Sequence, residues 1–447
     1  MKITKIKEII KNNNLRNISN LLIFLKNNWN LYEEEELREV AEYSNANRQK
    51  NAAYYTDDFI VQELVNALPI LDKQTISILE PSVGTGNFIM PLIYRLHDKF
   101  KRIDITVNDI DPDSIKLTKF FLERQEIPDN VRFHFTNFDY LSDFVFYDKK
   151  FDYIIGNPPF QRISLSEAKE YGDSEIRNIA GFFMRKSLCI SHVTCLVMPK
   201  SFLSIKDFKK NRDDVGSKRI TQISDFGEKG FKGVLIETIG IVVENKKPNK
   251  TRIHSFIDKS DTIVNQDYVI DPSFPTWLIY RNTVFDNIAK DMEFNIFTVF
   301  RDRQLTNSNM SNRGDIRVIK SRNISFDGSK IIDIPGYDRY ISYNSLKKLS
   351  VIKYIDRDDV YLVPNMTYYP RMIRKMKGVV TNGSVAILKL KEKKSINEKQ
   401  IKFFSSPLFR YFYKIARNKG TRSLNIDSVS VFWFGKYHGK GEINDVE

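Results

Sequence analysis

Residues 156 to 160, with the sequence Gly-Asn-Pro-Pro-Phe, combine hydrogen-bond acceptors, a rigid backbone and an aromatic ring. The two consecutive prolines fix φ and hold Asn157 and Pro158 in extended conformations. The Asn157 side-chain oxygen and the Pro158 carbonyl could then each accept one N–H of an exocyclic aromatic amine. These acceptors draw the nitrogen toward sp³ geometry and expose its lone pair, without a covalent intermediate. Phe160 supplies a flat face on which an extruded base can stack.

A glycine turn lies in the stretch LEPSVGTGNF, which spans residues 79 to 88 and follows a strand-like run. Gly84 and Gly86 let the backbone turn tightly and approach a ligand that a Cβ would exclude. Asp109 lies 25 residues after Gly84, at the end of the next strand-like run. A carboxylate at this spacing can hold the ribose hydroxyls of a nucleoside. The spacing therefore predicts a cofactor that contains a nucleoside.

The charges around this turn distinguish between cofactors. Ile89 occupies the third glycine position of the dinucleotide pattern GxGxxG, so that pattern is incomplete. Glu80 would repel a pyrophosphate and attract a cation. S-adenosyl-L-methionine carries a sulfonium and an ammonium group, so acidic side chains suit it. Asp139 follows a later strand-like run and is placed to accept a hydrogen bond from the adenine amine of that cofactor.

Alternating strand-like and helix-like segments position these motifs. Helical spans such as Phe88–Leu96 and Ser114–Arg124 separate most of the early runs, as parallel βαβ units require. The last two runs lie too close together for a crossover helix, so we expect an antiparallel pair. The pattern predicts an α/β, Rossmann-like sheet of seven strands with helices on both faces. The expected strands are Ile76–Leu79, Asp104–Val107, Val131–Phe135, Tyr153–Ile155, Thr194–Met198, Ile220–Phe226 and Val234–Val243.

The motifs also occur in a familiar order. LEPSVGTGNF, NDID, NFDYL and NPPF follow one another, and Met198–Leu203 and Phe226–Phe231 carry later motifs. Over roughly residues 51 to 245 the chain resembles the gamma-class N6-adenine DNA methyltransferases of type II restriction–modification systems, the TaqI-like modification methylases. The leading segment Ala53–Phe59 resembles their cofactor-contacting motif, and we expect Thr56 to cap the helix that follows.

This resemblance implies roles for individual residues. It implies that Asn157, Pro158, Phe160 and Phe231 act in catalysis, with Phe231 as a second aromatic side chain that stacks on the base. It implies that S-adenosyl-L-methionine is bound by Tyr55, Thr56, Glu80, Pro81, Gly84, Gly86, Asp109, Ile110, Asp139, Tyr140, Asn157 and Pro159.

Composition divides the chain into three expected parts. Residues 1–50 are a helical N-terminal extension, 51–275 the methyltransferase catalytic domain, and 276–447 an α+β domain that recognises the DNA target. The last part is rich in Arg, Asn and Ser, and ends in an expected aromatic strand, Val431–Phe434. Arg and Asn can read base edges, whereas Lys mostly positions phosphates. The expected DNA contacts are Arg301, Arg303, Arg322, Arg371, Arg374, Lys375 and Arg422.

The bulk composition agrees with a nucleic-acid partner. Lys and Arg total 70 against 56 Asp and Glu, a formal charge of +14, which suits a polyanion. Two cysteines and five scattered histidines predict neither a metal site nor a disulfide framework. The chain lacks a signal-peptide pattern and any run of eighteen apolar residues, so we expect a cytoplasmic protein.

The residues and the resemblance together favour one function. We expect a monomeric, site-specific enzyme that methylates the N6 amine of a flipped adenine in double-stranded DNA and protects host DNA from a cognate restriction endonuclease. About 50 residues before the catalytic domain are too few for a nuclease. The alternatives are a cytosine-N4 DNA methyltransferase, which usually has Ser where Asn157 stands, an RNA adenine or protein-glutamine methyltransferase, and a non-catalytic DNA-binding subunit.

Overall fold

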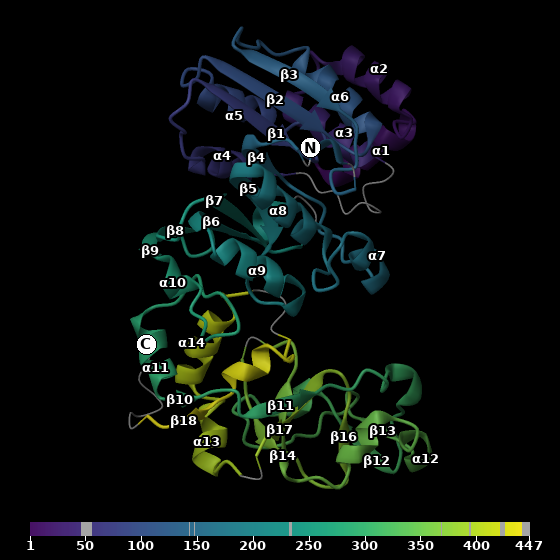
Figure 1. The fold of residues 1–447 in the computed structure, drawn as a ribbon. Helices are drawn as coiled ribbons and strands as arrows, with labels where there is room; N and C mark the ends of the chain where they lie inside the picture. Colours follow the sequence, from purple (N-terminus) through teal and green to yellow (C-terminus); the bar gives the residue numbers. More distant parts are fainter. Residues whose placement is uncertain are drawn as a thin grey trace. The chain divides into compact units, whose positions relative to one another are not determined.

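The computed structural model describes residues 1–45, 56–142, 144–146, 148–231, 235–367, 369–392, 395–420 and 425–439. The chain divides into two units, Met1–Tyr268 and Val269–Glu447, and each has its own sheets and its own hydrophobic core (Figure 1).

The first unit is built on one nine-stranded sheet with the order β3-β2-β1-β4-β5-β7-β6-β8-β9. Strands β1 to β5 run parallel to their neighbours among themselves, whereas β7 is antiparallel to both β5 and β6. The predicted α/β fold and its antiparallel pair are therefore confirmed. The strands are β1 Thr75–Glu80, β2 Arg102–Asn108, β3 Val131–Thr136, β4 Phe151–Gly156, β5 Ser191–Pro199, β6 Arg219–Gly227, β7 Thr238–Glu244, β8 Lys250–Ser255 and β9 Ser260–Asn265.

The predicted number of seven strands was wrong, because the sheet continues through β8 and β9. Neither β8 nor β9 was among the strands expected from the sequence. Strand β8 buries Thr251 and Ser255 beside Ile253, so its inward face is mostly polar and lacks a hydrophobic alternation. Strand β9 forms the edge of the sheet, and none of its side chains is fully buried.

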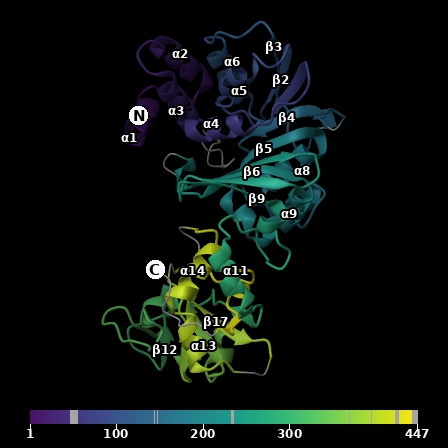
Figure 2. The ribbon, with the colours of Figure 1, turned by 90° about the vertical axis from the view of Figure 1, so that its left-hand side faces the viewer.

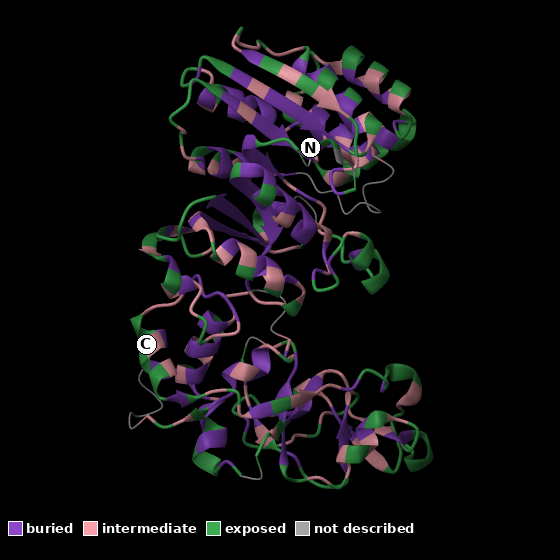
Figure 3. Cartoon of the chain, in the orientation of Figure 1, coloured by how far each residue is buried: buried purple, intermediate pink, exposed green. Residues whose placement is uncertain are grey.

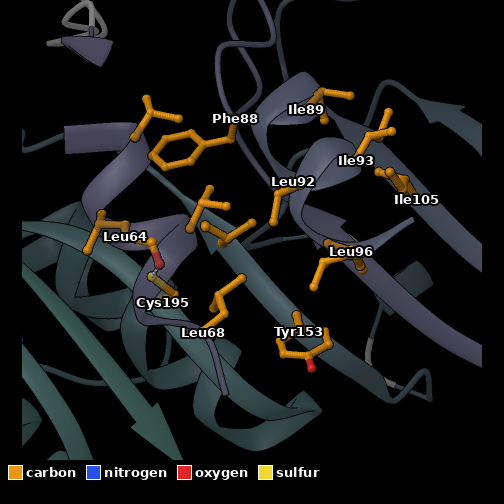
Figure 4. Close-up of a cluster of buried hydrophobic side chains, with 14 of the residues drawn as sticks. Leu64, Leu68, Phe88, Ile89, Leu92, Ile93, Leu96, Ile105, Tyr153 and Cys195 are labelled. Atoms are coloured by element: carbon orange, nitrogen blue, oxygen red, sulfur yellow. Dashed lines mark hydrogen bonds between the residues drawn. The ribbon is translucent and has the colours of Figure 1, made fainter. Parts of the chain in front are cut away.

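Helices cover both faces of this sheet (Figures 1 and 2). Alternate strand residues, including Ile78, Ile105 and Cys195, pack with α4 and α5, and Figure 4 shows this cluster around Leu64 and Leu92. The opposite face is also buried, and there α8 packs against β5 and α9 against β6. The helices are α4 Asp58–Ala67, α5 Ile89–Leu96, α6 Pro112–Leu122, α7 Leu165–Glu170, α8 Ile179–Ile190, α9 Lys209–Gly216 and α10 Gln266–Val269.

The N-terminal residues form three helices that belong to the first unit. They are α1 Ile3–Asn12, α2 Ile18–Asn28 and α3 Glu34–Ser44, and they pack against α6 (Figure 1). Phe120 and Phe121 of α6 join their core, where Trp29 lies edge-on to Phe120 at 5.9 Å between ring centroids. The described part of the expected extension, residues 1–45, consists of these three helices and the turns between them.

The second unit contains small sheets and short helices, and Figure 3 shows its buried residues in separate clusters. The sheets are β10-β18, β11-β17-β14-β15 and β13-β12-β16. The strands are β10 Met292–Glu293, β11 Phe297–Phe300, β12 Ile316–Ile319, β13 Arg339–Ile341, β14 Val360–Pro364, β15 Ile373–Arg374, β16 Val379–Thr381, β17 Val385–Leu390 and β18 Lys436–Tyr437; the helices are α11 Thr283–Lys290, α12 Tyr343–Leu346, α13 Glu398–Phe403 and α14 Pro407–Ala416.

The expected aromatic strand at residues 431–434 was wrong. Ser430–Trp433 is a 3₁₀ helix, because the Asp427 side chain accepts hydrogen bonds from the N–H groups of Val429 and Ser430 and caps a turn. The aromatic side chains of the segment instead fill a core, in which Trp433 packs against Phe285. In the part of the chain that the structure describes, no helix is long and apolar enough to cross a membrane.

Candidate active site

A pocket of about 350 Å³ lies where the parallel strands of the first unit end. Strands β1, β2, β3 and β4 point in one direction, so the loops that follow them meet at the same edge of the sheet. Residues 80–85 after β1, 109–111 after β2, 139–141 after β3 and Asn157 after β4 all line this pocket. Its volume is in the range of sites for small molecules and cofactors.

Most of the residues expected to bind a cofactor line this one pocket. They are Thr56, Glu80, Pro81, Gly84, Asp109, Ile110, Asp139, Tyr140, Asn157 and Pro159. Gly86 does not line it: its φ is +82°, and a Cβ there would lie 3.0 Å from Thr118 Cγ2, so Gly86 lets α6 approach the turn. Tyr55 lies outside the described residues.

The glycine turn is held to the neighbouring strand ends by hydrogen bonds. Gly84 has φ of +57°, and its N–H donates to Asp109 Oδ2 at 2.9 Å. Asp109 Oδ1 accepts from the Asp111 N–H, also at 2.9 Å. Buried Asn108 donates to the carbonyls of Pro81 and Phe138, at 3.2 and 3.0 Å. The loops after β1, β2 and β3 therefore form one connected rim.

The pocket is strongly acidic. Among the described residues, Lys, Arg and His are absent from its lining, which contains the carboxylates Glu42, Glu80, Asp109, Asp111 and Asp139. Burial and then the nearby Asp109 raise the pKa of Glu80 well above its usual range, and Glu80 Oε2 is buried without a hydrogen-bond partner in the described part of the chain. Burial raises the pKa of Asp109 to about 6, although backbone N–H groups oppose this shift. Such a site stabilises a cationic ligand and disfavours a pyrophosphate.

Asn157 lies at the start of the loop after β4 and lines this pocket. Its Nδ2 donates to Thr56 Oγ1 at 3.0 Å, and its backbone carbonyl accepts from Ser82 Oγ at 3.3 Å. The expected capping role of Thr56 was wrong, because Asp57 caps α4 by accepting from the Phe59 N–H. The Thr56 hydroxyl instead sets the rotation of the Asn157 amide, with Nδ2 toward Thr56 and Oδ1 on the other side.

Two aromatic rings from separate segments meet next to Asn157. The Phe160 and Phe231 ring centroids are 5.7 Å apart, with an interplanar angle of 58°. Phe231 is 3% exposed, Phe160 is half-buried, and Pro158 between the strand and Phe160 is buried. None of the three lines the acidic pocket itself. Of the residues expected to act in catalysis, Asn157 therefore lines the pocket, whereas Pro158, Phe160 and Phe231 do not.

The N-terminal helix α3 also contributes to the pocket, which the sequence did not suggest. Ala41, Glu42 and Asn45 line it. Asn45 Nδ2 donates to Asp111 Oδ2 at 3.0 Å, and Glu42 Oε1 accepts from Thr85 Oγ1 at 2.9 Å. No motif marks these residues. The apolar stripe of α3 indicates that one face of the helix is buried, but it does not indicate which other residues the helix contacts.

The residues expected to contact DNA lie in different environments in the second unit. Arg303 and Arg322 are exposed, and Arg301 is half-buried. Arg374 is exposed, and its Nη2 donates to the Ile396 carbonyl at 3.3 Å. Arg422 lies outside the described residues.

Two of the expected DNA contacts hold the fold of the second unit instead of facing solvent. Lys375 is 1% exposed, and its Nζ donates to the carbonyls of Ile355, Arg357 and Met376 at 2.8 to 3.2 Å. Burial lowers the pKa of Lys375 to about 8. We therefore remove Lys375 from the expected DNA contacts. Arg371 is half-buried and donates to four oxygen atoms, so its guanidinium is largely committed to neighbouring loops.

An aromatic and cationic cluster in the second unit was missed. Phe326 and Tyr369 are 58% and 44% exposed, and their ring centroids are 5.0 Å apart. The Arg410 guanidinium carbon lies 5.0 Å from the Phe326 centroid and 4.4 Å from that of Tyr369. The three side chains come from distant parts of the sequence, so spacing could not reveal the cluster.

A comparison with protein families shows which family the chain belongs to. The model of the Eco57I restriction-modification methylase family matches residues 3–231, about half of the chain, including α1 to α3 and the whole pocket. The chain belongs to this family. Methylases with this fold take their methyl group from S-adenosylmethionine, and the acidic pocket with its unpartnered Glu80 oxygen fits that cofactor.

Similar proteins agree with the family but are distant. The methylase subunit of the type I restriction enzyme MjaIX from Methanocaldococcus jannaschii is 29% identical over 110 residues, which are 24% of this chain and 18% of that protein. The match therefore spans less than a fifth of that relative.

Two solved structures show weak similarity. A putative class I S-adenosylmethionine-dependent methyltransferase from Listeria monocytogenes is 20% identical, with a TM-score of 0.39, over 50% of this chain and 73% of that chain. A modification subunit of a putative type I restriction enzyme from Vibrio vulnificus is 15% identical, with a TM-score of 0.40, and the match covers 50% of this chain and 50% of that chain. The family assignment rests on the family match alone.

Proposed function

We propose that this chain is a site-specific DNA methyltransferase that transfers a methyl group from S-adenosylmethionine to the N6 amine of a flipped adenine in double-stranded DNA, of the gamma class. Its role would be to protect host DNA from a cognate restriction endonuclease. The observation that carries the proposal is the position of Asn157, whose amide is oriented by Thr56 at the edge of an acidic cofactor pocket.

Different residues of the pocket would bind different groups of the cofactor. Glu80 and Asp109 balance its positive charge, and Asp139 lies after β3, where it can accept a hydrogen bond from the adenine amine. When bound, the cofactor supplies an electrophilic methyl group on a sulfonium. The acidic lining therefore supports a cofactor that carries a net positive charge before transfer.

Asn157 and Pro158 would prepare the target amine. Asn157 Oδ1 and the Pro158 carbonyl each accept one N–H, so the nitrogen lone pair turns toward the methyl group. A bound cofactor would supply the methyl group to this lone pair, while Asn157 and Pro158 would hold the two amine protons, one of which would pass to solvent water after transfer. Because Asn157 Nδ2 is engaged by Thr56, the amide is preorganised with its oxygen turned away from that hydroxyl.

Phe160 and Phe231 would hold the flipped base. The two rings touch each other, so an adenine stacks on the accessible part of Phe160 while Phe231 supports that ring from behind. Unstacking a base from the duplex costs a few kcal/mol, which stacking on an aromatic side chain offsets in part.

The second unit would recognise the DNA target, as residues 276–447 were expected to do. It holds 31 of the 70 Lys and Arg and 18 of the 56 Asp and Glu, so residues 269–447 carry +13 of the total charge of +14. The first unit is close to neutral. Exposed Arg303 and Arg322, and the cluster of Phe326, Tyr369 and Arg410, are the side chains best placed to contact DNA.

The proposal is tested by sequencing DNA from a bacterial host that lacks adenine modification, with and without this protein. We expect N6-methyladenine at one short recognition sequence with the wild type, and none with Asn157→Ala. The Asn157→Ala protein should still bind S-adenosylmethionine within about threefold of the wild type, because Asn157 contacts the target amine. Unmodified adenine with the folded, cofactor-binding wild type would overturn the proposal.

A further inference from the structure

Arg371 holds together the two loops that carry the exposed aromatic rings of the second unit. Its guanidinium donates to two carbonyls of residues 321–324, just before Phe326, at 3.1 and 3.3 Å. It also donates to Thr367 Oγ1 and to the Tyr369 carbonyl, at 3.4 and 3.2 Å. All four acceptors are neutral oxygens. The bonds therefore fix the positions of both rings without balancing the charge of Arg371.

Phe326 is presented to solvent by a tight turn, residues 325–330. The Asp327 carboxylate accepts from the hydroxyls of two serines in this turn, at 2.6 and 2.8 Å, and from the N–H of one of them at 3.0 Å. Gly328 has φ of +72°, and a Cβ there would collide with Ser405 Oγ, so the turn packs closely on the segment between α13 and α14. The backbone under Phe326 is thus well fixed, although its ring is 58% exposed.

The positive charge next to these rings is not balanced by a carboxylate. In the part of the chain that the structure describes, Arg410 forms no ion pair, and its buried Nε has no hydrogen-bond partner. The Arg410 guanidinium instead lies over the rings of Phe326 and Tyr369. Burial, and then the nearby charge of Arg410, lowers the pKa of Arg371. Two neighbouring guanidinium groups of this kind favour an anion from outside the chain.

DNA offers both kinds of group that this cluster can bind. A guanidinium forms charge-assisted hydrogen bonds with a phosphate, and an aromatic ring stacks on a base of any sequence. The cluster also lies in the unit that carries +13 of the total charge. We propose that the cluster is a nucleotide subsite, in which Arg410 binds a DNA phosphate and Phe326 stacks on an adjacent base. This inference rests on the proposed function, because it takes duplex DNA as the partner.

Stacking on Phe326 has a consequence for the DNA. A base within an intact duplex exposes its edges and not its faces, so a ring can stack on it only where a base step is opened. Opening a step costs a few kcal/mol, which favours a ring that is already held in place by the protein. The fixed turn under Phe326 and the four bonds of Arg371 meet this requirement.

The test separates the charge contact from the stacking contact. Fluorescence anisotropy would measure the affinity of the full chain for a duplex that carries the recognition sequence found by sequencing host DNA, over a series of salt concentrations. Arg410→Gln should weaken binding about tenfold to a hundredfold at the lowest salt, and reduce the slope of log affinity against log salt by about 1. Phe326→Ala should weaken binding about fivefold to a hundredfold with an unchanged slope, because stacking releases no counterions.

Matched variants control for shape and for net charge. Phe326→Tyr keeps a flat ring and should bind nearly as well as the wild type, whereas Phe326→Leu keeps apolar bulk without a ring and should bind nearly as poorly as Phe326→Ala. Lys377→Gln removes one positive charge that Asp358 already neutralises, at 3.6 Å, so it should leave the slope unchanged. Thermal melting of each variant verifies that it is folded.

Each outcome supports or overturns the inference. If the wild type binds the duplex but Arg410→Gln keeps the full slope, Arg410 contacts no phosphate and the inference fails. It also fails if Phe326→Leu binds as well as the wild type, or if Lys377→Gln changes the slope as much as Arg410→Gln does. If Arg410→Gln does not fold, the series at exposed Phe326 decides alone. A wild type that does not bind the duplex would contradict the proposed function instead.

Discussion

Asp109 couples the cofactor pocket to pH. It lies at the end of β2 with both oxygens bound by backbone N–H groups, yet burial raises its pKa to about 6. The unfolded carboxyl has its ordinary pKa near 3.8, so the folded state binds the proton more tightly between these values. The stability contributed by protonated Asp109 is therefore present below about pH 4 and is lost as the pH rises through 6.

We predict that Asp109→Asn removes this pH dependence. Relative to the wild type, the variant without cofactor should gain up to about 3 kcal/mol of unfolding free energy between pH 4 and pH 7, because the asparagine has no charge to desolvate. Urea denaturation at both pH values measures this difference. A difference between the two proteins that does not change with pH would contradict the raised pKa of Asp109.

Thr56 gives a second prediction for a single residue. Thr56→Val keeps the shape of the side chain but removes the oxygen that accepts from Asn157 Nδ2. The rate of methyl transfer should fall about tenfold to a hundredfold, because a loosely oriented amide is a poorer acceptor for the target amine. Ser82→Ala, which removes a longer bond to the Asn157 carbonyl, is the matched control and should have a smaller effect. Single-turnover assays would show the reverse order if Thr56 has no orienting role.

At the residue scale, the locations of side chains that directly follow strands were predicted better from the sequence than the locations of side chains on irregular loops. Asp139 and Asn157 were expected to contact the same ligand, because parallel strands end at the same edge of a sheet. Both residues line one pocket. Lys375 was expected at the surface because it lies in a basic run, but a charge run does not show which member is buried. Its three carbonyl acceptors come from separate loops, which spacing cannot predict.

Helix α4, which begins just after Thr56, packs on strand β7. Gly240 of β7 lies directly beneath α4, and a Cβ there would collide with Leu64 Cδ2. We predict that Gly240→Ala destabilises the protein by about 1–3 kcal/mol, because either the helix or the Leu64 rotamer must shift. Urea denaturation measures this loss. The double variant Leu64→Ala/Gly240→Ala should lose less than the sum of the single variants, and strict additivity would indicate that the two residues do not contact each other.

At the element scale, buried hydrophobic strands were predicted well and polar or capped segments were not. Strands β4 and β5 are buried along nearly their whole length, on both faces of the sheet, and such continuous apolar runs are a clear strand pattern. Strand β8 was missed because Thr251 and Ser255 replace apolar side chains on its buried face. Helix α3 was predicted as a helix, but the pocket residue Glu42 was not, because long-range packing onto α6 decides where that helix lies.

Across the whole molecule, catalysis and positive charge are segregated. The first unit holds the acidic pocket and is nearly neutral, whereas the second unit carries +13. An acidic site repels phosphates, so under the proposed function the affinity for DNA comes from the basic second unit. We therefore expect DNA affinity to fall steeply as salt increases, since each neutralised phosphate releases counterions.

We predict that Arg303→Ala weakens DNA binding, whereas Lys375→Ala lowers the stability of the fold. Arg303 is exposed, so its loss should weaken DNA binding and reduce the slope of log affinity against log salt by about 1 if Arg303 contacts a phosphate. Lys375→Ala should instead destabilise the fold by about 1–3 kcal/mol, because three partly buried carbonyls lose their donor. Fluorescence anisotropy across a salt series and urea denaturation measure the two effects. A Lys375→Ala protein that is stable but binds DNA poorly would restore Lys375 as a DNA contact.

Under the proposed function, the site around Asn157 methylates the exocyclic amine of adenine in duplex DNA. The most direct measurement incubates the protein with duplex DNA and S-adenosylmethionine labelled on its methyl group, digests the DNA to nucleosides and identifies the labelled one. The labelled methyl group should be found in N6-methyldeoxyadenosine and in no other nucleoside. Label in N4-methyldeoxycytidine, or none in the DNA while the protein binds both cofactor and duplex, would contradict it.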